Sequence, residues 1–484
     1  MFVAIARRTK NNQQKTNNTF QSKIQNPKSK IDMNLTYWQL IRGNRNFRNL
    51  LYGQTVSELG NWFNFIAGLG LVRVVSEASP TAAGILFLCR LLPFALFSPI
   101  AGTFVDRFSR RTVMIFSDLI RVVIALMFLL VSDAENLWIA YVATALLSTF
   151  GAFFDGARNA ATPNLTGKEG LLAGTALMFS TRFLLMAIGS ALGGWAAAIF
   201  GYKVAFLINA ASFLVSAFSV WLIPEEATRE EKETRRSGDE EILESPALAG
   251  ALPEMKDEAD IKRESFINEL KEGFRYTVKN RFALTILLMN IIWATGGGAI
   301  NVVFERMGGI VFAERESRNP DLAVALLWTA SGFGLFLGMM IAHRVSTYLD
   351  RKNLNSPFIV WTLIVHGVLF AIAGYMPSLW LFMFFCFISR AVVGVEYAVQ
   401  ETMFQRSLPD YIRGRISTLD RGAEMTVFGL SSYAASWSML VISPQLLTVI
   451  SGILSASAGI LWFVRTRREN VITYGQENYD RCVK

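Results

Sequence analysis

Six charged side chains lie inside stretches of the sequence that are otherwise apolar, where charge can do chemistry in a hydrophobic setting. They are Glu58, Arg90, Arg182, Arg390, Glu396 and Glu424. Burying one such charge in hydrocarbon costs at least about 2.5 to 3.5 kcal/mol, so each is expected to face the protein interior and to meet a partner or a ligand. Carboxylates in such places can take up and release protons, and guanidinium groups can hold anions.

Among the carboxylates, Glu58 is the first candidate to carry a transported proton. It lies about 12 Å into its apolar stretch, and the surrounding "VSELGNW" places no other charge beside it. Glu396 is the second candidate, because it lies about 120° around a helix from Arg390 and need not pair with it. Glu424 follows Arg421 by three residues, the spacing of an intrahelical ion pair. The alternative for Glu58 is a permanent ion pair with an arginine of another helix.

Three arginines, Arg90, Arg182 and Arg390, fall near the middle of their apolar stretches. Together they predict a cavity that accepts an anionic or carboxylate-bearing compound, unless each is neutralised by an internal ion pair. His366 could titrate near neutral pH, but a single histidine in such a stretch is more often a hydrogen-bonded packing residue.

A second concentration of charge is the short segment "GTFVDRFSRR". Its glycine and charged residues are Gly102, Asp106, Arg107, Arg110 and Arg111. An acid near a helix end can cap a neighbouring helix, arginines can pair with distant acids, and a glycine permits close helix approach. Asp118 and Arg121 follow on one helical face and are expected to form a local structural pair. The alternative is that the charges of this segment only fix the orientation of the chain in the membrane.

The elements that must position these residues are long apolar helices. The chain has 484 residues, of which 52% are hydrophobic and 18% charged, a higher apolar content than that of ordinary soluble domains. About 20 mostly apolar residues span the hydrocarbon of a bilayer, and such runs recur along the sequence. They centre near residues 62, 93, 122, 147, 186, 212, 293, 334, 366, 390, 428 and 455. The predicted fold is all-α and integral to the membrane, with twelve transmembrane helices in two six-helix bundles.

Two polar stretches divide the chain into its predicted parts. These parts are a disordered cytoplasmic tail at 1–33, a six-helix bundle at 34–223, a cytoplasmic linker at 224–281, a second six-helix bundle at 282–466 and a cytoplasmic tail at 467–484. Translation could instead start at Met33. Within the linker, Phe266, Leu270, Phe274 and Val278 recur every fourth residue, which predicts an amphipathic helix along the inner membrane surface.

The distribution of basic residues predicts the orientation. Residues 1–50 contain ten lysines and arginines and one acid, Asp32, which accounts for the whole net charge of +9. The even-numbered connections are also basic, whereas those after spans three, nine and eleven contain no lysine or arginine. Because short cytoplasmic loops retain basic residues, both termini are predicted to be cytoplasmic. The predicted outer loop 305–321 is an exception to this rule, because it contains basic residues. Its basic residues Arg306, Arg315 and Arg318 are offset in sequence by Glu305, Glu314, Glu316 and Asp321.

The charged segment fits the pattern G-x-x-x-D-R-x-x-R-R and resembles the loop between helices two and three of the major facilitator superfamily. Further stretches resemble its drug:proton antiporter branch, which contains macrolide efflux proteins and the enterobactin exporter. They are "GQTVSELGNW", "SDLIR", "ARNAATPNL", "ALGG", "ELKEGFRYTVKN" and "QRSLPDYIRGR". The likeness covers roughly residues 34–466. It implies a substrate path between the bundles, and it implies that Asp106 and its arginines close the inner gate in the outward-facing state.

One stretch departs from the resemblance. Family antiporters often have a glycine–proline pair in span five, where this chain has Ser190 after Gly189. The glycines Gly189, Gly193 and Gly194 are therefore interpreted as helix-packing positions.

The sequence thus predicts a secondary active transporter that exports an amphipathic or anionic small molecule, a drug or a siderophore, by proton-coupled alternating access. The alternatives are a flippase for lipids or lysophospholipids and a non-transporting membrane scaffold or sensor on the same fold. The expected partners are the substrate, protons and the lipid bilayer, with no nucleic acid, and the expected state is a monomer in a bacterial inner membrane.

Enzymatic chemistry is not expected. Cys89, Cys386 and Cys482 are scattered without metal-ligand spacing, the chain has two histidines, and it contains no G-x-x-x-x-G-K-[ST] phosphate-binding motif. We therefore expect no cofactor, no metal site and no ATPase activity, and we expect an ion gradient to supply the energy.

Overall fold

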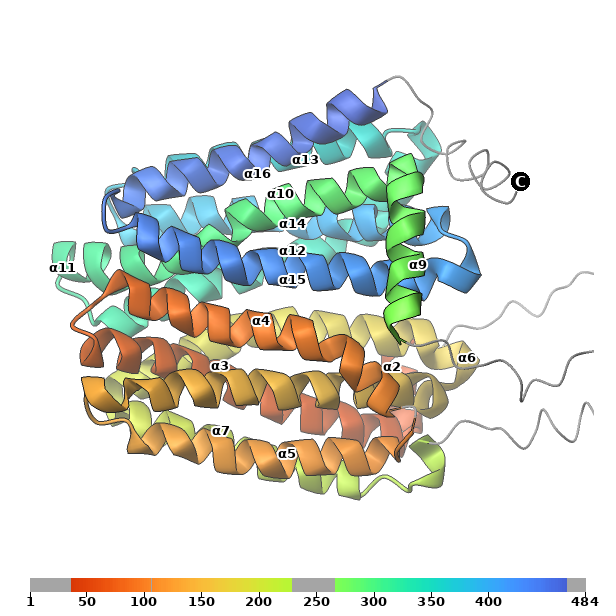
Figure 1. The fold of residues 1–484 in the computed structure, drawn as a ribbon, viewed down its shortest axis with the longest axis horizontal. Helices are drawn as coiled ribbons and strands as arrows, with labels where there is room; N and C mark the ends of the chain where they lie inside the picture. The colour runs from red at the N-terminus through yellow and green to blue at the C-terminus, as the bar shows by residue number, and fades with distance from the viewer. Residues whose placement is uncertain (1–35, 106, 229–265, 468–484) are drawn as a thin grey trace, which may run out of the picture.

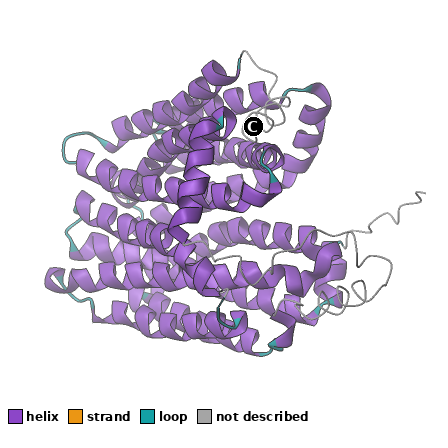
Figure 2. Cartoon of the chain, turned by 45° about the vertical axis from the view of Figure 1, so that its right-hand side comes forward, coloured by secondary structure: helices purple, strands orange, loops and turns teal. Residues whose placement is uncertain are grey.

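The computed structural model describes residues 36–105, 107–228 and 266–467, and every structural statement below concerns these ranges. In them the chain is all-α, with no strand (Figure 2). The predicted N-terminal tail, most of the predicted linker and the C-terminal residues from 468 onward lie outside the described residues.

Two groups of helices form the described chain. The first group consists of α2 (Tyr37–Gly43), α3 (Arg45–Val75), α4 (Pro80–Val105), α5 (Arg110–Met127), α6 (Leu137–Phe200) and α7 (Tyr202–Trp221), with short 3-10 turns at Phe128–Leu130, Ala134–Asn136 and Glu226–Thr228. The second consists of α9 (Phe266–Lys279), α10 (Arg281–Arg306), a π-helix (Met307–Phe312), α11 (Ala313–Arg315), α12 (Pro320–Lys352), α13 (Asn355–Ala373), α14 (Leu379–Ser407), α15 (Asp410–Ser438) and α16 (Pro444–Thr466).

The predicted spans are confirmed as long helices. Ten segments of the described chain are long and apolar enough to cross a membrane. Helices α3 and α15 cover the other two predicted positions, at 31 and 29 residues. They fall outside the ten because polar residues such as Glu58 and Arg421 interrupt their apolar runs. The two least apolar spans therefore carry candidate functional residues.

Helix α6 supplies two of the spans. Gly167 interrupts it with φ of +66° and ψ of 175°, a backbone conformation that glycine adopts at no steric cost. The candidate spans accordingly run from Ala134 to Gly167 and from Glu169 to Phe200. The fourth and fifth predicted spans thus meet at one glycine rather than through a loop.

Side-chain caps define where several helices begin. The Asn44 side chain accepts a hydrogen bond from the backbone N–H of Phe47 at the start of α3 (2.9 Å). Asn319 accepts from the backbone of Asp321 at the start of α12 (2.9 Å), and Pro320 occupies the first helical position. These contacts satisfy backbone donors that a helix leaves unpaired at its first turn.

The long helices of both groups lie side by side, with α3 to α7 in one bundle and α10 to α16 in the other (Figure 1). One end of the molecule carries the short connections at 76–79, 316–319, 374–378 and 439–443; we call it the short-loop end. The opposite end carries α2, α9 and the points where the described chain stops, and we call it the tail end.

The two bundles pack together toward the short-loop end and have separate apolar cores toward the tail end. The largest cluster of buried apolar residues joins both bundles, since it includes Phe65 and Phe87 of one and Phe304 and Trp328 of the other. Two further clusters, around Phe47 and around Trp462, each belong to a single bundle. Between the bundles, α4 packs against α15 and α6 packs against α12.

The glycines along α4 and α15 show the same separation. A side chain at Gly84 would collide with Ser436, so the two helices touch there. At Gly102 and Gly422, nearer the tail end, no neighbouring atom lies within 4 Å of a Cβ position. No close helix approach is made at Gly102 in this conformation, because α4 and α15 have diverged at that level.

The predicted amphipathic helix is present as α9, which crosses the tail end at a steep angle to the long helices (Figure 1). Its apolar side chains Phe274 and Val278 are 57% and 49% exposed. Glu272 pairs with Arg415 of α15. An exposed apolar face on a helix that lies across the bundle end is the arrangement of an interfacial helix.

Candidate functional site

A buried ion cluster joins the two bundles at the short-loop end. Arg73 of α3 pairs with Asp321 of α12, and its Nη1 lies 3.5 Å from Oε1 of Glu305 of α10. The hydroxyl of Tyr202 donates to Asp321 (2.9 Å). The side chains of the three charged residues are 8% exposed or less. We call these four residues the Arg73 lock.

The lock adds to the prediction for residues 305–321. Glu305 and Asp321 are buried against Arg73 of the other bundle, and Glu305 also interacts electrostatically with Arg306 of its own segment. Arg318 pairs locally with Glu316 (2.6 Å). Arg306 donates to the backbone carbonyl of Ala78 (2.5 Å), which adds a second contact between the bundles.

Below the lock, aromatic rings continue the contact between the bundles. The ring centroid of Trp328 lies 5.6 Å from that of Trp62 and 5.2 Å from that of Phe65. The guanidinium of Arg90 lies 4.3 Å from the centroid of Phe65, a cation–π arrangement. No ion pair is found for Arg90 among the described residues, although Glu58 interacts with it electrostatically.

On the first bundle, a loose charge cluster lies on the tail side of this aromatic layer. Nε of Arg182 is 4.0 Å from Oε1 of Glu58, and its Nη1 is 3.8 Å from Oδ2 of Asp155. Asp155 also pairs with Arg158 at 2.9 Å. The Arg182 side chain is 48% exposed. Glu58 therefore lies near an arginine of another span, which favours the alternative that it forms an ion pair between helices.

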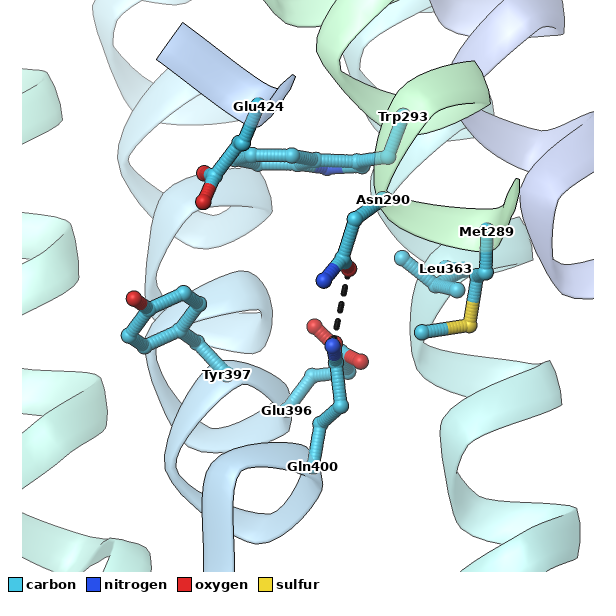
Figure 3. A pocket seen from close by; sticks show the side chains of 8 residues that line it. All are labelled: Met289, Asn290, Trp293, Leu363, Glu396, Tyr397, Gln400 and Glu424. Atoms are coloured by element: carbon cyan, nitrogen blue, oxygen red, sulfur yellow. Dashed lines mark hydrogen bonds between the residues drawn. The ribbon is translucent and has the colours of Figure 1, made fainter. Parts of the chain in front are cut away.

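On the second bundle, Glu396 of α14 and Glu424 of α15 line one pocket (Figure 3). The pocket is completed by Met289, Asn290, Trp293, Leu363, Tyr397 and Gln400. Gln400 donates to Asn290 (2.8 Å), whose own amide donates to Asp420 (2.9 Å). One carboxyl oxygen of Glu396 is buried without a hydrogen-bond partner, and no ion pair is found for it in the described part of the chain.

Arg421 borders this pocket. The predicted pair with Glu424 is present, with Nη1 3.6 Å from Oε2. The guanidinium also lies 5.4 Å from the ring centroid of Tyr397. From the other bundle, Arg182 lies close enough to Arg421 and Tyr397 for electrostatic interaction. The charge clusters of the two bundles thus face each other across the molecule.

Arg390 occupies different surroundings from the other two predicted cavity arginines. It is 8% exposed and lies against Phe304, with its guanidinium 5.9 Å from the ring centroid, and beside Cys386 of its own helix. His366 nearby is fully buried, and its Nδ1 is 2.6 Å from the hydroxyl of Ser389. No contact with Arg90 or Arg182 is found in the described structure.

The gate segment lies at the tail end, and Asp106 is outside the described residues. Arg110 donates to the carbonyl of Thr228 (3.2 Å) and Arg111 to that of Trp221 (2.6 Å), both in their own bundle, while Arg107 is exposed. The described arginines of the segment therefore make no contact with the second bundle here. That agrees with the divergence of α4 and α15 at this end.

Other sequence predictions concern packing. Asp118 and Arg121 form the expected buried pair, and the guanidinium lies between the rings of Phe154 and Phe213. Gly189 and Gly194 pack closely, against Trp62 and against Ala325 of the second bundle respectively. Gly193 packs against Phe63, and the Ser190 hydroxyl donates to the carbonyl of Met186 (2.6 Å).

Several site residues were missed from the sequence. Asp155 and Arg158 have the spacing of an intrahelical pair and could have been found by it. Arg73 and Tyr202 meet Asp321 only through the packing of distant spans, so no local signal marks them. The described residues contain no group of three histidine, cysteine or acidic side chains that could hold a metal ion.

Two bundles of long apolar helices, with charge clusters facing each other between them, define a polytopic membrane transporter fold. The family profile of the Major Facilitator Superfamily matches residues 50–356. The chain belongs to this superfamily.

Relatives and solved structures agree with this membership. The chain is 24% identical over 414 residues to the multidrug efflux pump Tap of Mycolicibacterium fortuitum, covering 82% of this chain and 88% of that protein. It is 22% identical over 355 residues to macrolide efflux protein A of Streptococcus pyogenes, covering 72% and 76%. A bacterial homologue of the iron transporter ferroportin in its inward-facing state has a similar fold, with a TM-score of 0.60 at 16% identity, covering 89% and 98%.

Proposed function

We propose that this chain exports an amphipathic small molecule, a drug or a siderophore, in exchange for protons by alternating access. The observation that carries the proposal is the asymmetry of the contact between bundles. The buried Arg73 lock joins them at the short-loop end, whereas α4 and α15 diverge at the tail end. A transporter that is closed to one side of the membrane and open to the other has this arrangement. The named efflux functions of two relatives favour export.

The tail end is proposed to be cytoplasmic, with both termini on that side of a bacterial inner membrane. The net positive charge of residues 1–50 supports this orientation. The position of α9 across the tail end is that of a helix at the inner membrane surface. In this orientation the conformation is open to the cytoplasm and closed to the outside, so the site is accessible to a compound that is to be exported.

We propose Glu396, with Glu424 beside it, as the proton-coupling site. Glu396 has a buried carboxyl oxygen without a partner and shares its pocket with a second carboxylate (Figure 3). Two carboxylates in one buried site disfavour simultaneous ionisation, so the pair is suited to hold a proton. Glu58 remains the alternative, but Nε of Arg182 lies 4.0 Å from its carboxylate.

Transport is expected in everted membrane vesicles that contain the chain. The tail end then faces the bath, so respiring vesicles should accumulate a radiolabelled macrolide such as erythromycin, and a protonophore should abolish the accumulation. Vesicles without the chain are the control. Accumulation that persists after the proton gradient collapses would refute proton coupling. Translocation of a fluorescent lysophospholipid in place of the macrolide would favour the flippase alternative.

The orientation has a separate test with single cysteines in a background that lacks Cys89, Cys386 and Cys482. Ser237→Cys, in the predicted linker, should resist an impermeant thiol reagent in intact cells and react in everted vesicles. Ser132→Cys, exposed at the short-loop end, is the matched control and should react in intact cells. The reverse labelling pattern would invert the proposed orientation.

A further inference from the structure

Polar side chains of the second bundle form a hydrogen-bonded network beside the Glu396 pocket. Gln400 of α14 donates to the amide oxygen of Asn290 of α10 (2.8 Å; Figure 3), and Nδ2 of Asn290 donates to Oδ2 of Asp420 of α15 (2.9 Å). Asp420 is 8% exposed, and its other carboxyl oxygen, Oδ1, is buried without a hydrogen-bond partner. Because a buried carboxylate without a partner is costly, Oδ1 is placed to accept a proton.

Asp420 lies one helical turn from Glu424 of the pocket, on the same face of α15 and nearer the tail end. Side chains four residues apart on a helix have Cβ atoms about 5 to 6 Å apart, a separation that one water molecule can bridge. The pocket itself has a volume of about 10 Å³, about the least that holds one water molecule. A proton held by Glu396 and Glu424 therefore has Asp420 as its next acceptor toward the tail end.

Further polar groups continue from Asp420 toward the tail end. Nε2 of Gln405 donates to Oε1 of Glu401 (2.7 Å) and to the hydroxyl of Ser417 (3.1 Å), which ties α14 to α15. Ser417 precedes Asp420 by three residues and so lies on the same face of α15. Glu401, Gln405 and Ser417 are half-buried, whereas Asp420 is buried. Exposure to water therefore increases along the network toward the tail end.

We infer that Asp420 and Glu401 carry the proton between the Glu396 pocket and the tail end, along a path inside the second bundle; the inference rests on the proposed function. Glu396 or Glu424 gives up its proton and becomes a carboxylate, and Oδ1 of Asp420 takes the proton and becomes a carboxylic acid. Asp420 then passes the proton to Glu401, and Glu401 passes it to water at the tail end. Each step transfers one proton and no electrons. The proton can thus leave through one bundle while cargo occupies the space between the two.

Two neighbours of Asp420 fit this role. Asn290 is a positioning residue, because its amide holds Oδ2 and leaves Oδ1 to accept the proton. Arg421 follows Asp420 in sequence and so lies about 100° away around α15. Its Nη1 is 3.6 Å from Oε2 of Glu424, and its guanidinium lies over the ring of Tyr397. Asp420 thus has no ion pair among the described residues and can gain and lose a proton without breaking one.

The test follows the proton on Glu396 directly and needs no cargo. Purified full-length protein in detergent receives a rapid rise in bath pH, ending above the range in which Glu396 titrates. Time-resolved infrared spectroscopy records the carboxylic acid C=O band that is missing in Glu396→Gln. In Asp420→Asn this band should decay at least about 100-fold more slowly than in the unmodified protein, because a positioned proton-transfer group contributes about 100- to 10,000-fold to a rate.

Further variants distinguish a proton relay from a structural role. Asp420→Glu should keep the decay rate within a few-fold, and added formate should restore part of the rate in Asp420→Asn by replacing the missing carboxylate. Glu401→Gln should slow the decay less, because water reaches this half-buried position. Asp350→Asn removes a tail-end carboxylate of the same bundle that pairs with Arg406 (3.0 Å). It is the matched control and should not change the rate.

The outcomes separate this inference from the proposed function. An unchanged decay in Asp420→Asn, or the absence of any band that depends on Glu396, would overturn the path. Slow decay that neither Asp420→Glu nor formate restores would assign Asp420 a structural role and overturn it as well. If macrolide accumulation in vesicles occurs in these cases, only the path fails. If Asp420→Asn slows the decay as expected but no gradient-driven accumulation occurs, only the proposed function fails.

Discussion

Replacing Arg73 with glutamine is expected to open the short-loop end. The substitution leaves Glu305 and Asp321 buried without their cation, and breaking a buried ion pair in this way costs about 3 to 5 kcal/mol. Because that cost falls on the closed state alone, the ratio of open to closed molecules should rise at least about 100-fold. Spin labels at Ser132→Cys and Tyr375→Cys, exposed on opposite bundles at that end, should move apart.

Two further variants make this result specific. Arg318→Gln removes a cation from the same end, but its partner Glu316 lies in the same bundle, so the distance should not change. The triple variant Arg73→Gln, Glu305→Gln, Asp321→Asn removes all three charges and should recover much of the closed state, since neutral replacements leave no buried charge uncompensated. An unchanged distance in the single variant would show that the Arg73 lock does not hold the bundles together.

Replacing Glu396 with glutamine is expected to abolish proton-driven accumulation of the macrolide in everted vesicles. Glutamine has the shape of a protonated glutamate but cannot release a proton, so the exchange cycle should stop at this step. Downhill exchange of labelled for unlabelled macrolide needs no net proton movement and should persist. Glu314→Gln, which removes an exposed carboxylate of the same bundle at the short-loop end, is the matched control. Retained gradient-driven accumulation in Glu396→Gln would place the coupling elsewhere.

The fold was predictable because a bilayer restricts what a chain can do. Apolar runs must satisfy their backbone hydrogen bonds internally, so each run long enough to span becomes a helix. The predicted centres near 62 and 428 coincide with α3 and α15, although these are the least apolar of the spans. Gly167 was not recognised as the junction between two spans, because the sequence around it also fits an ordinary loop.

Ion pairs within one helix were predictable, whereas those between helices were not. The spacing of three residues placed Asp118 beside Arg121, and Arg421 beside Glu424, as the structure confirms. The pair between Arg73 and Asp321 joins residues 248 positions apart. Only the way the two bundles dock brings them together, and no helical periodicity contains that information.

Direction around a helix could not be predicted from position along the span. Arg90, Arg182 and Arg390 were assigned to one central cavity from their positions along their spans. The structure places Arg182 toward the second bundle but buries Arg390 among Phe304 and Cys386. An error of one residue in helical phase rotates a side chain by about 100°, so sequence position alone could not separate these surroundings.

Proton coupling at Glu396 is tested most directly by the release of protons when substrate binds. Lightly buffered everted vesicles are mixed with the macrolide, and the pH of the bath is followed with an impermeant dye. We expect release of about one proton per bound macrolide in the unmodified protein, no release in Glu396→Gln with binding retained, and release in Glu58→Gln. Unchanged proton release in Glu396→Gln, or its loss in Glu58→Gln instead, would contradict the proposed coupling site.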